Sequence, residues 1–97
     1  MTDPFTASAS VNTATPDRYA KQLASHLGRR CEVREETTGL LLIFTDGDCL
    51  LHPTTETLEL RASASGAAEL DHITHVVGSH LERFGQRHDL QAHWKQP

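Results

Sequence analysis

Cysteine is scarce in this sequence, and so are the motifs that mark the common enzyme classes. Cys31 and Cys49 stand eighteen positions apart without a CxxC partner, which is neither the disulfide framework of a small secreted protein nor the spacing of a zinc site. No GxGxxG, GxxxxGK[ST] or GxSxG motif occurs, so dinucleotide binding, triphosphate binding and serine nucleophiles lack motif support. We expect both cysteines to be small, reduced, hydrophobic side chains.

Long apolar runs and an excess of basic residues are also missing. No stretch approaches the roughly 20 apolar residues of a membrane span. The first ten residues have neither the basic n-region nor the apolar h-region of a secretory signal. The sequence therefore predicts a cytoplasmic protein with no membrane segment. Nine Lys and Arg residues against 13 Asp and Glu give a net charge of -4, which argues against nucleic-acid binding because phosphate contacts need a basic face.

Histidine, by contrast, is plentiful. Protonation of all seven histidines would change the formal charge from -4 to +3, and an unperturbed histidine gains its proton below about pH 6.5. We expect most of the seven to lie on the solvated surface. Ninety-seven residues suffice for one domain with one core. Residues 1–6, polar and without periodicity, are expected to be disordered, and residues 7–97 to form a single α+β domain.

Local signals place two helices. Thr15 can cap the first helix and Pro16 suits its first position, and the helix is expected to end at Leu27, where Gly28 would supply a left-handed stop.

The second, longer helix is expected to begin at Ser65 or Gly66 and to extend to about Arg87. Gly78 and Gly85 inside it would each cost about 1 kcal/mol relative to alanine. We expect a close approach of neighbouring structure to compensate for them.

The remaining segments have strand character. Asp46-Gly47 is a strong hairpin signal, since this pair accepts the positive φ values of a type I′ turn. The predicted order is β-α-β-β-β-β-α-β, in one antiparallel sheet that carries both helices on one face. The expected strands are residues 7–13, 31–36, 40–45, 48–52, 57–62 and 90–95.

Two histidines border the apolar faces of the two helices. At 100° per residue, His80 closes one edge of the arc of the long helix, and His26 borders the arc of the first. If the helices lie side by side, the imidazoles could approach across the groove between them, where they could bind a metal, haem iron or an acidic ligand, or move protons. The simpler alternative is that each ring donates a hydrogen bond to a backbone carbonyl and packs half-buried. The apolar arcs are Leu70, Ile73, Thr74, Val77, Leu81 and Phe84 on the long helix, and Tyr19, Ala20, Leu23 and Leu27 on the first.

Several short blocks together resemble a known family. They are Arg18-Tyr19, Gln22-Leu23, His26, Gly47-x-Cys49-x-Leu51, Leu58, His80-Leu81-Glu82-Arg83-Phe84 and Trp94. They are similar to the short bacterial proteins grouped as domain-of-unknown-function family 2218, and the resemblance covers roughly residues 7 to 95. The sequence departs from the family pattern at Leu27, where a tryptophan is common, and at Gly85, where an alanine is common. Family members are often encoded beside, or fused to, flavin-dependent siderophore-interacting reductases. The resemblance therefore implies an accessory role in iron uptake, and it identifies no catalytic residue and no cofactor.

The leading hypothesis is a non-enzymatic cytoplasmic binding or accessory module in iron or siderophore utilisation. Its ligand would lie between the helices, with His26 and His80 as polar anchors and Tyr19 and Phe84 as apolar walls. The metal, if one binds, is left open.

Two alternatives come from other classes. The chain could be a protein-interaction module that docks on a flavin reductase or forms a homodimer through the uncovered face of the sheet, to which Leu41, Ile43 or Leu50 would point. It could also be a small enzyme that uses His26 and His80 as acid and base.

Overall fold

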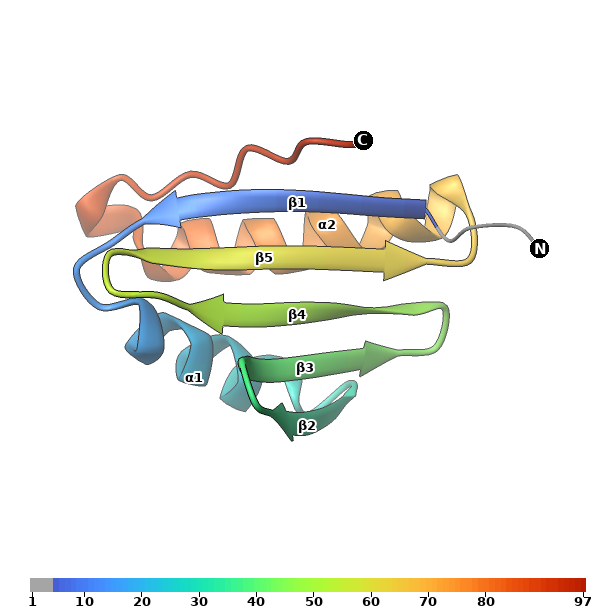
Figure 1. The fold of residues 1–97 in the computed structure, drawn as a ribbon, viewed down its shortest axis with the longest axis horizontal. Coiled ribbons are helices and arrows are strands. Elements are labelled where there is room, and N and C mark those ends of the chain that lie inside the picture. Colours follow the sequence, from blue (N-terminus) through green and yellow to red (C-terminus); the bar gives the residue numbers. More distant parts are fainter. Residues whose placement is uncertain (1–4) are drawn as a thin grey trace.

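The computed structural model describes residues 5–97 and contains one antiparallel sheet with two helices behind it (Figure 1). The order of strands across the sheet is β1-β5-β4-β3-β2. The predicted α+β class and the placement of both helices on one face are therefore confirmed. The elements are β1 (Phe5–Asn12), α1 (Pro16–Leu27), β2 (Glu32–Glu36), β3 (Gly39–Phe44), β4 (Gly47–Pro53), β5 (Thr57–Ala64), α2 (Ala67–Phe84) and the 3-10 helix η1 (Gln86–His88).

Alternation of side chains along the strands creates the core. In β5, Leu58, Leu60 and Ala62 are buried as predicted, while Arg61 between them is exposed. The apolar arcs of α1 and α2 pack on this face of the sheet. In β1 the small residues Ala7 and Ala9 are buried in the same way. The strand begins at Phe5, so the predicted boundary at residue 7 was too late, and residues 1–4 lie outside the described residues.

The predicted hairpin between β3 and β4 is confirmed, but its predicted turn geometry is wrong. Phe44 pairs with Gly47, so Thr45 and Asp46 form the turn. Neither Asp46 nor Gly47 has a positive φ, which a type I′ turn would require. Gly47 is needed for another reason: a Cβ there would lie 2.2 Å from the carbonyl oxygen of Ser63 on β5. The glycine allows β4 and β5 to approach.

The ends of both helices differ from those that the sequence predicts. Gly28 is right-handed, with φ of -61°, and its N–H donates to the carbonyl of Ala24 at 2.8 Å. The side chain of Thr15 makes no capping hydrogen bond. The long helix ends at Phe84 instead of Arg87, and Gly85 lies just beyond it. A Cβ at Gly85 would come within 2.4 Å of the Leu90 side chain, because the chain folds back there to bury Leu90.

The final strand predicted for residues 90–95 does not form. This extended segment makes one isolated bridge, in which Ser8 and Lys95 exchange backbone hydrogen bonds of 2.9 and 2.7 Å. Its alternating side chains face α2 instead: Trp94 packs at Gly78, and a carboxylate oxygen of Glu82 accepts the N–H of Ala92 at 3.0 Å. The close approach expected at Gly78 is thus confirmed. The segment runs beside β1 (Figure 1), which leaves β2 as the open edge of the sheet.

Candidate functional site

Helices α1 and α2 bring His26 and His80 together. Their ring centroids are 5.0 Å apart and the ring planes are inclined by 47°. Phe84, one turn after His80, meets the His26 ring edge-on at 5.4 Å and lies 6.3 Å from the His80 ring. The expected approach of the two imidazoles is therefore confirmed, and Phe84 lies beside both of them.

The hydrogen bond of His80 fixes the orientation of its ring. Its Nδ1 lies 2.7 Å from the carbonyl oxygen of Val76, one turn earlier in α2. Because a carbonyl only accepts, Nδ1 carries the proton and Nε2 remains free for a ligand. The simpler reading thus holds for His80, which is half-buried and bonded to the backbone. His26 is exposed, and no described residue is hydrogen-bonded to its ring.

Tyr19 does not form a wall of this site. It lies two turns before His26 on α1 and belongs to the hydrophobic core, with 7% of its surface exposed. A side chain so deeply packed against Leu23 and its neighbours offers a ligand very little contact area. The four candidate residues are thus divided: the two histidines and Phe84 form one cluster at the surface, and Tyr19 supports α1 from inside.

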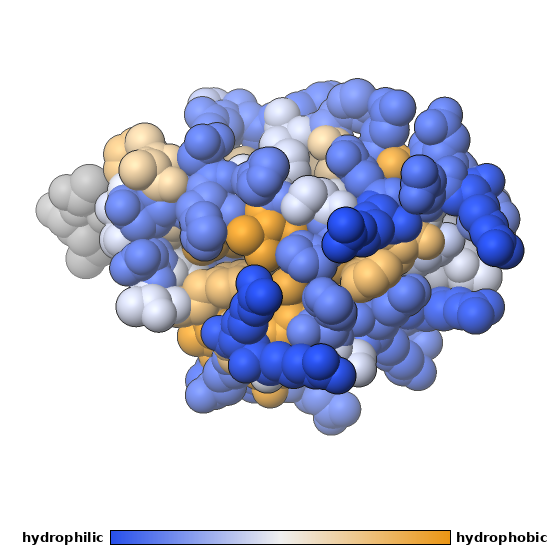
Figure 2. Space-filling model, turned by 180° about the vertical axis from the view of Figure 1, so that it is seen from behind, coloured by the Kyte–Doolittle hydropathy of each residue, from blue (hydrophilic) through white to orange (hydrophobic). Residues whose placement is uncertain are grey.

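One hollow adjoins the histidine cluster on the helix-bearing face, and a second lies one helical turn away along α2. An open depression of about 280 Å³ is lined by Ser79, His80 and Arg83. A groove of about 260 Å³ is lined by Val76, one helical turn before His80, and by Leu27 at the end of α1. Figure 2 shows hydrophobic side chains gathered near the middle of this face, among hydrophilic ones. The groove is lined by Leu27, Arg30, Phe44, Thr45, Asp46, Glu69, His72, Ile73 and Val76.

Sequence reasoning missed this groove. Val76 stands outside the apolar arc drawn for the long helix, and Phe44 ends a strand far from it in sequence. The one local signal is that Val76 lies one helical turn from both Ile73 and His80. Only the tertiary fold, which brings α2, the end of α1 and the end of β3 around one groove, turns these positions into a continuous lining.

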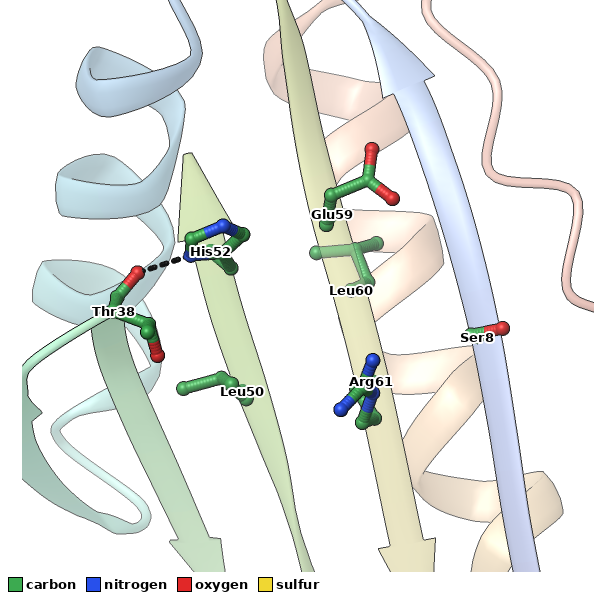
Figure 3. Close-up of a pocket in the computed structure, with 7 residues that line it drawn as sticks. All are labelled: Ser8, Thr38, Leu50, His52, Glu59, Leu60 and Arg61. Carbon is green, nitrogen blue, oxygen red and sulfur yellow. Dashed lines mark hydrogen bonds between the residues drawn. The ribbon is translucent and has the colours of Figure 1, made fainter. Parts of the chain in front are cut away.

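A second cluster that the sequence did not reveal lies on the uncovered face of the sheet (Figure 3). His52 and Glu59 are direct partners in the register of β4 and β5. The Nδ1 of His52 donates to the carbonyl of Thr38, and Ser10 donates to a carboxylate oxygen of Glu59 at 2.5 Å. These side chains and their neighbours border a hollow of about 310 Å³, lined by Ser8, Thr38, Leu50, His52, Glu59, Leu60 and Arg61.

The charge of Glu59 is favoured by this arrangement. The hydrogen bond from Ser10 and then that from Thr57 lower the pKa of the Glu59 carboxyl, and the nearby His52 and Arg61 act in the same direction. His52, Thr57 and Arg61 lie near Glu59 in sequence, whereas Ser10 is 49 residues away on β1, so only the pairing of β1 with β5 brings it to the carboxylate.

The donor set does not fit a bare iron ion at the histidine pair. Within residues 5–97 no three His, Cys, Asp or Glu side chains are grouped so as to hold a metal, and two imidazoles alone leave most iron ligand positions unfilled. The cysteines do not add to the site. Burial raises the pKa of the Cys49 thiol to about 12 and also raises that of Cys31, and both changes disfavour the thiolate form that binds metals and reacts.

Comparisons with known proteins agree with this fold. Across the described helices, none is long and apolar enough to cross a membrane. No curated protein matches the chain. A solved structure, titled "NMR structure of PA4090 from Pseudomonas aeruginosa", is similar with a TM-score of 0.78 and 25% identity, and the match covers 94% of this chain and 95% of that one. The sequence model of a family described as "Uncharacterized protein conserved in bacteria (DUF2218)" matches residues 8–95, which extend from β1 to the C-terminal segment, and the chain therefore belongs to this bacterial family.

Proposed function

We propose that this protein is a non-enzymatic binding module for a small amphipathic organic anion, held on its helix-bearing face. The observation that carries the proposal is the pair of imidazoles, His26 and His80, whose ring centroids lie 5.0 Å apart, one helical turn from a groove of mixed apolar and polar lining that Val76 borders. Small-molecule sites combine an apolar surface with a few convergent polar groups. This face of the protein has both within one helical turn of each other.

The polar end of the site would hold the anionic group. His80 offers Nε2, His26 offers an exposed ring, and Arg83 lies beside His80 at the edge of the open depression. Arginine and protonated histidine form charge-assisted hydrogen bonds with carboxylates, and these are among the stronger hydrogen bonds in proteins. Phe84 closes one side of the imidazole pair and keeps the rings in place.

The apolar end would hold the hydrocarbon part of the ligand. The half-buried Phe44 and Val76 are the apolar side chains that the groove offers to a ligand, since Leu27 is only 1% exposed. Removal of apolar surface from water stabilises a complex by about 25 cal/mol per Å², so a contact of about 100 Å² would contribute about 2.5 kcal/mol. An aromatic carboxylate of the size of benzoate is therefore the smallest ligand expected to use both ends.

An accessory role in iron or siderophore utilisation fits this type of site. A ferric chelate brings its own donor atoms, so as a ligand it needs no third protein side chain on the metal. Many such chelates carry carboxylates or aromatic rings. We therefore propose that the physiological ligand is an anionic chelate of this class, and that a siderophore-interacting reductase is the partner that the bound chelate reaches in the cytoplasm.

The test is a titration of the protein with salicylate, an aromatic carboxylate, followed by NMR of the histidine ring protons. We expect saturable chemical-shift changes of the ring protons of His26 and His80 as salicylate is added. His80→Ala and His26→Ala should each weaken binding at least about tenfold, or 1.4 kcal/mol. His75→Ala is the matched control, since His75 is exposed elsewhere on α2.

Two further probes separate the parts of the proposal. Inorganic phosphate tests the polar end alone, and ferric citrate tests an iron chelate. Absence of any saturable shift with salicylate up to about 10 mM would refute the site, because a Kd in that range already corresponds to less than about 3 kcal/mol of binding free energy. Equal effects of His75→Ala and His80→Ala would also count against it. If the protein binds salicylate but does not bind ferric citrate, the site is supported and the role in iron utilisation is refuted.

A further inference from the structure

Two polar side chains face each other on the uncovered side of the sheet. His52 on β4 is the direct partner of Glu59 on β5, and directly paired residues of an antiparallel sheet have their Cβ atoms about 4.5–5.5 Å apart on one face. Burial of Leu51 and Leu60 in the core places both polar side chains on the face opposite the helices. This pair is therefore separate from the imidazole pair on the helix-bearing face.

Hydrogen bonds direct these two side chains apart and leave each of them able to accept. The Nδ1 of His52 donates to the carbonyl of Thr38, in the turn before β3, so Nε2 of the neutral ring keeps its lone pair. Ser10 on β1 donates to Glu59 at 2.5 Å, and Thr57 also bonds to this carboxylate. A carboxylate has about four lone-pair sites, so it can accept a further donor. Both side chains line the hollow of about 310 Å³ between them.

A cation lies one row further along the same face. Arg61 is two residues after Glu59 on β5, about 6.6 Å along the strand, and its direct partner on β4 is Leu50. Arg61 is exposed, and it forms no ion pair with a carboxylate of residues 5–97. Figure 3 shows both of these side chains on the hollow, one step along the strands from His52 and Glu59. The hollow thus has two acceptors at one end, and a guanidinium beside a half-buried leucine at the other.

We propose that this hollow binds the zwitterion of a free α-amino acid with an apolar side chain. An ammonium group has three N–H donors and no acceptor, so it matches Nε2 of His52 and the carboxylate of Glu59. The α-carboxylate lies toward Arg61, whose guanidinium can donate two parallel N–H groups to it. The apolar side chain of the ligand covers Leu50. Each charge of the ligand meets the opposite charge of the protein.

The spacing of the charged groups fits this ligand. The ammonium nitrogen and the carboxyl carbon of an α-amino acid are about 2.5 Å apart. With hydrogen bonds of about 2.9 Å at both ends, the ligand bridges a carboxylate and a guanidinium roughly 8 Å apart. The rows of Glu59 and Arg61 differ by about 6.6 Å along β5, and the long arginine side chain reaches the rest of the distance.

The ends of a peptide suit the hollow less well than a free amino acid. The first residue of a peptide has the ammonium group, but a neutral amide takes the place of its carboxylate. The last residue has the carboxylate, but its nitrogen is a neutral amide. Each of them leaves one charged side chain of the hollow without a charged partner, and hydrogen bonds to charged groups are stronger than neutral ones.

Titration of the full chain with L-leucine, followed by NMR, tests the site. At pH 7 α-amino groups are mostly protonated. We expect saturable chemical-shift changes of the His52 ring protons and of the Glu59 and Arg61 amides, with a Kd of about 1 mM or below. L-Leucinamide lacks the carboxylate and N-acetyl-L-leucine lacks the ammonium group. Each should bind at least about tenfold more weakly than L-leucine.

Two variants separate the ends of the ligand. Glu59→Gln should weaken the binding of L-leucine at least about tenfold and leave that of N-acetyl-L-leucine unchanged, because this probe has no ammonium group. Arg61→Gln should weaken L-leucine by a similar factor and leave L-leucinamide unchanged, because this probe has no carboxylate. Glutamine at position 59 can still accept from Ser10, and circular dichroism checks the fold of both variants.

Glu32→Gln and Arg34→Gln are the matched controls. They make the same changes on β2, where the two side chains pair with each other at 3.6 Å and do not line the hollow. Neither should alter the Kd of L-leucine. Equal weakening by these controls and by Glu59→Gln and Arg61→Gln would overturn the proposal.

Three further outcomes would also overturn it. One is the absence of saturable changes with L-leucine up to about 20 mM. Another is equal binding of L-leucine and both of its derivatives. The third is a response of His26 and His80 in place of His52, which would assign the amino acid to the helix-bearing face. The salicylate titration is read at that other face, so failure of one site leaves the other unaffected.

Discussion

Gly78 lies in the middle of α2, and its replacement by alanine should not raise the free energy of unfolding, although alanine usually stabilises a helix relative to glycine. It is buried, and a Cβ at this position would lie 3.0 Å from Nε1 of Trp94 and 3.5 Å from the Cβ of Ala92. The first distance is shorter than normal van der Waals contact. The C-terminal segment, which is not a strand, is therefore what requires a glycine here.

The expected magnitude follows from two opposing effects. Replacement of glycine by alanine inside a helix stabilises it by about 1 kcal/mol. In the wild type, the indole of Trp94 must move by a few tenths of an ångström to admit the new methyl group, and lost packing cancels this gain. We expect the free energy of unfolding of Gly78→Ala to be unchanged or lower. When Trp94→Ala has removed the indole, Gly78→Ala should raise it by about 1 kcal/mol.

Urea unfolding followed by circular dichroism at the helix band measures the cycle of four proteins. With a slope of about 2 kcal/mol/M, a change of 1 kcal/mol moves the midpoint by about 0.5 M. Ser79→Ala is the control, because Ser79 is exposed beside Gly78 and should have the same effect in both backgrounds. A full 1 kcal/mol gain for Gly78→Ala in the wild type, or no coupling to Trp94, would refute the packing of this segment against α2.

Three further outcomes are expected. Leu81→Ala, at a fully buried position of α2, should lower the free energy of unfolding by about 2–5 kcal/mol in denaturant titration, and a loss below 1 kcal/mol would contradict the core described here. In the native state Cys49 should resist a thiol reagent such as 5,5′-dithiobis(2-nitrobenzoate) at neutral pH, since its thiol pKa is raised to about 12 by burial, while half-buried Cys31 reacts slowly; rapid reaction of two thiols per chain would argue against this. Hydrogen bonds lower the pKa of Glu59 in the fold, so its contribution to stability is present above the pKa of an unfolded glutamate and is lost as the pH falls through the folded value. Glu59→Gln should therefore lose less stability than the wild type on acidification below about pH 4.5, and identical pH profiles of the unfolding midpoint would disprove the effect.

Features that repeat within a few residues followed from the sequence alone. The alternation in β5, the apolar arcs of both helices and the position of His26 and His80 at the edges of those arcs depend on helix and strand periods. Such periods determine which side of an element must be buried. They were enough to predict one sheet with two helices on the same face, and hence the meeting of the two imidazoles.

Tertiary packing decided what local patterns leave open. Locally, Gly47 is typical of a turn and Gly85 of a helix interior, whereas in the fold the close approach of Ser63 and of Leu90 leaves no room for a Cβ at these positions. The same holds for residues 90–95, whose alternation suits a strand but whose apolar side chains find a partner surface on α2. The period of a helix or strand determines which of its faces is buried. Which other element covers that face depends on the packing of the whole core, to which segments distant in sequence contribute.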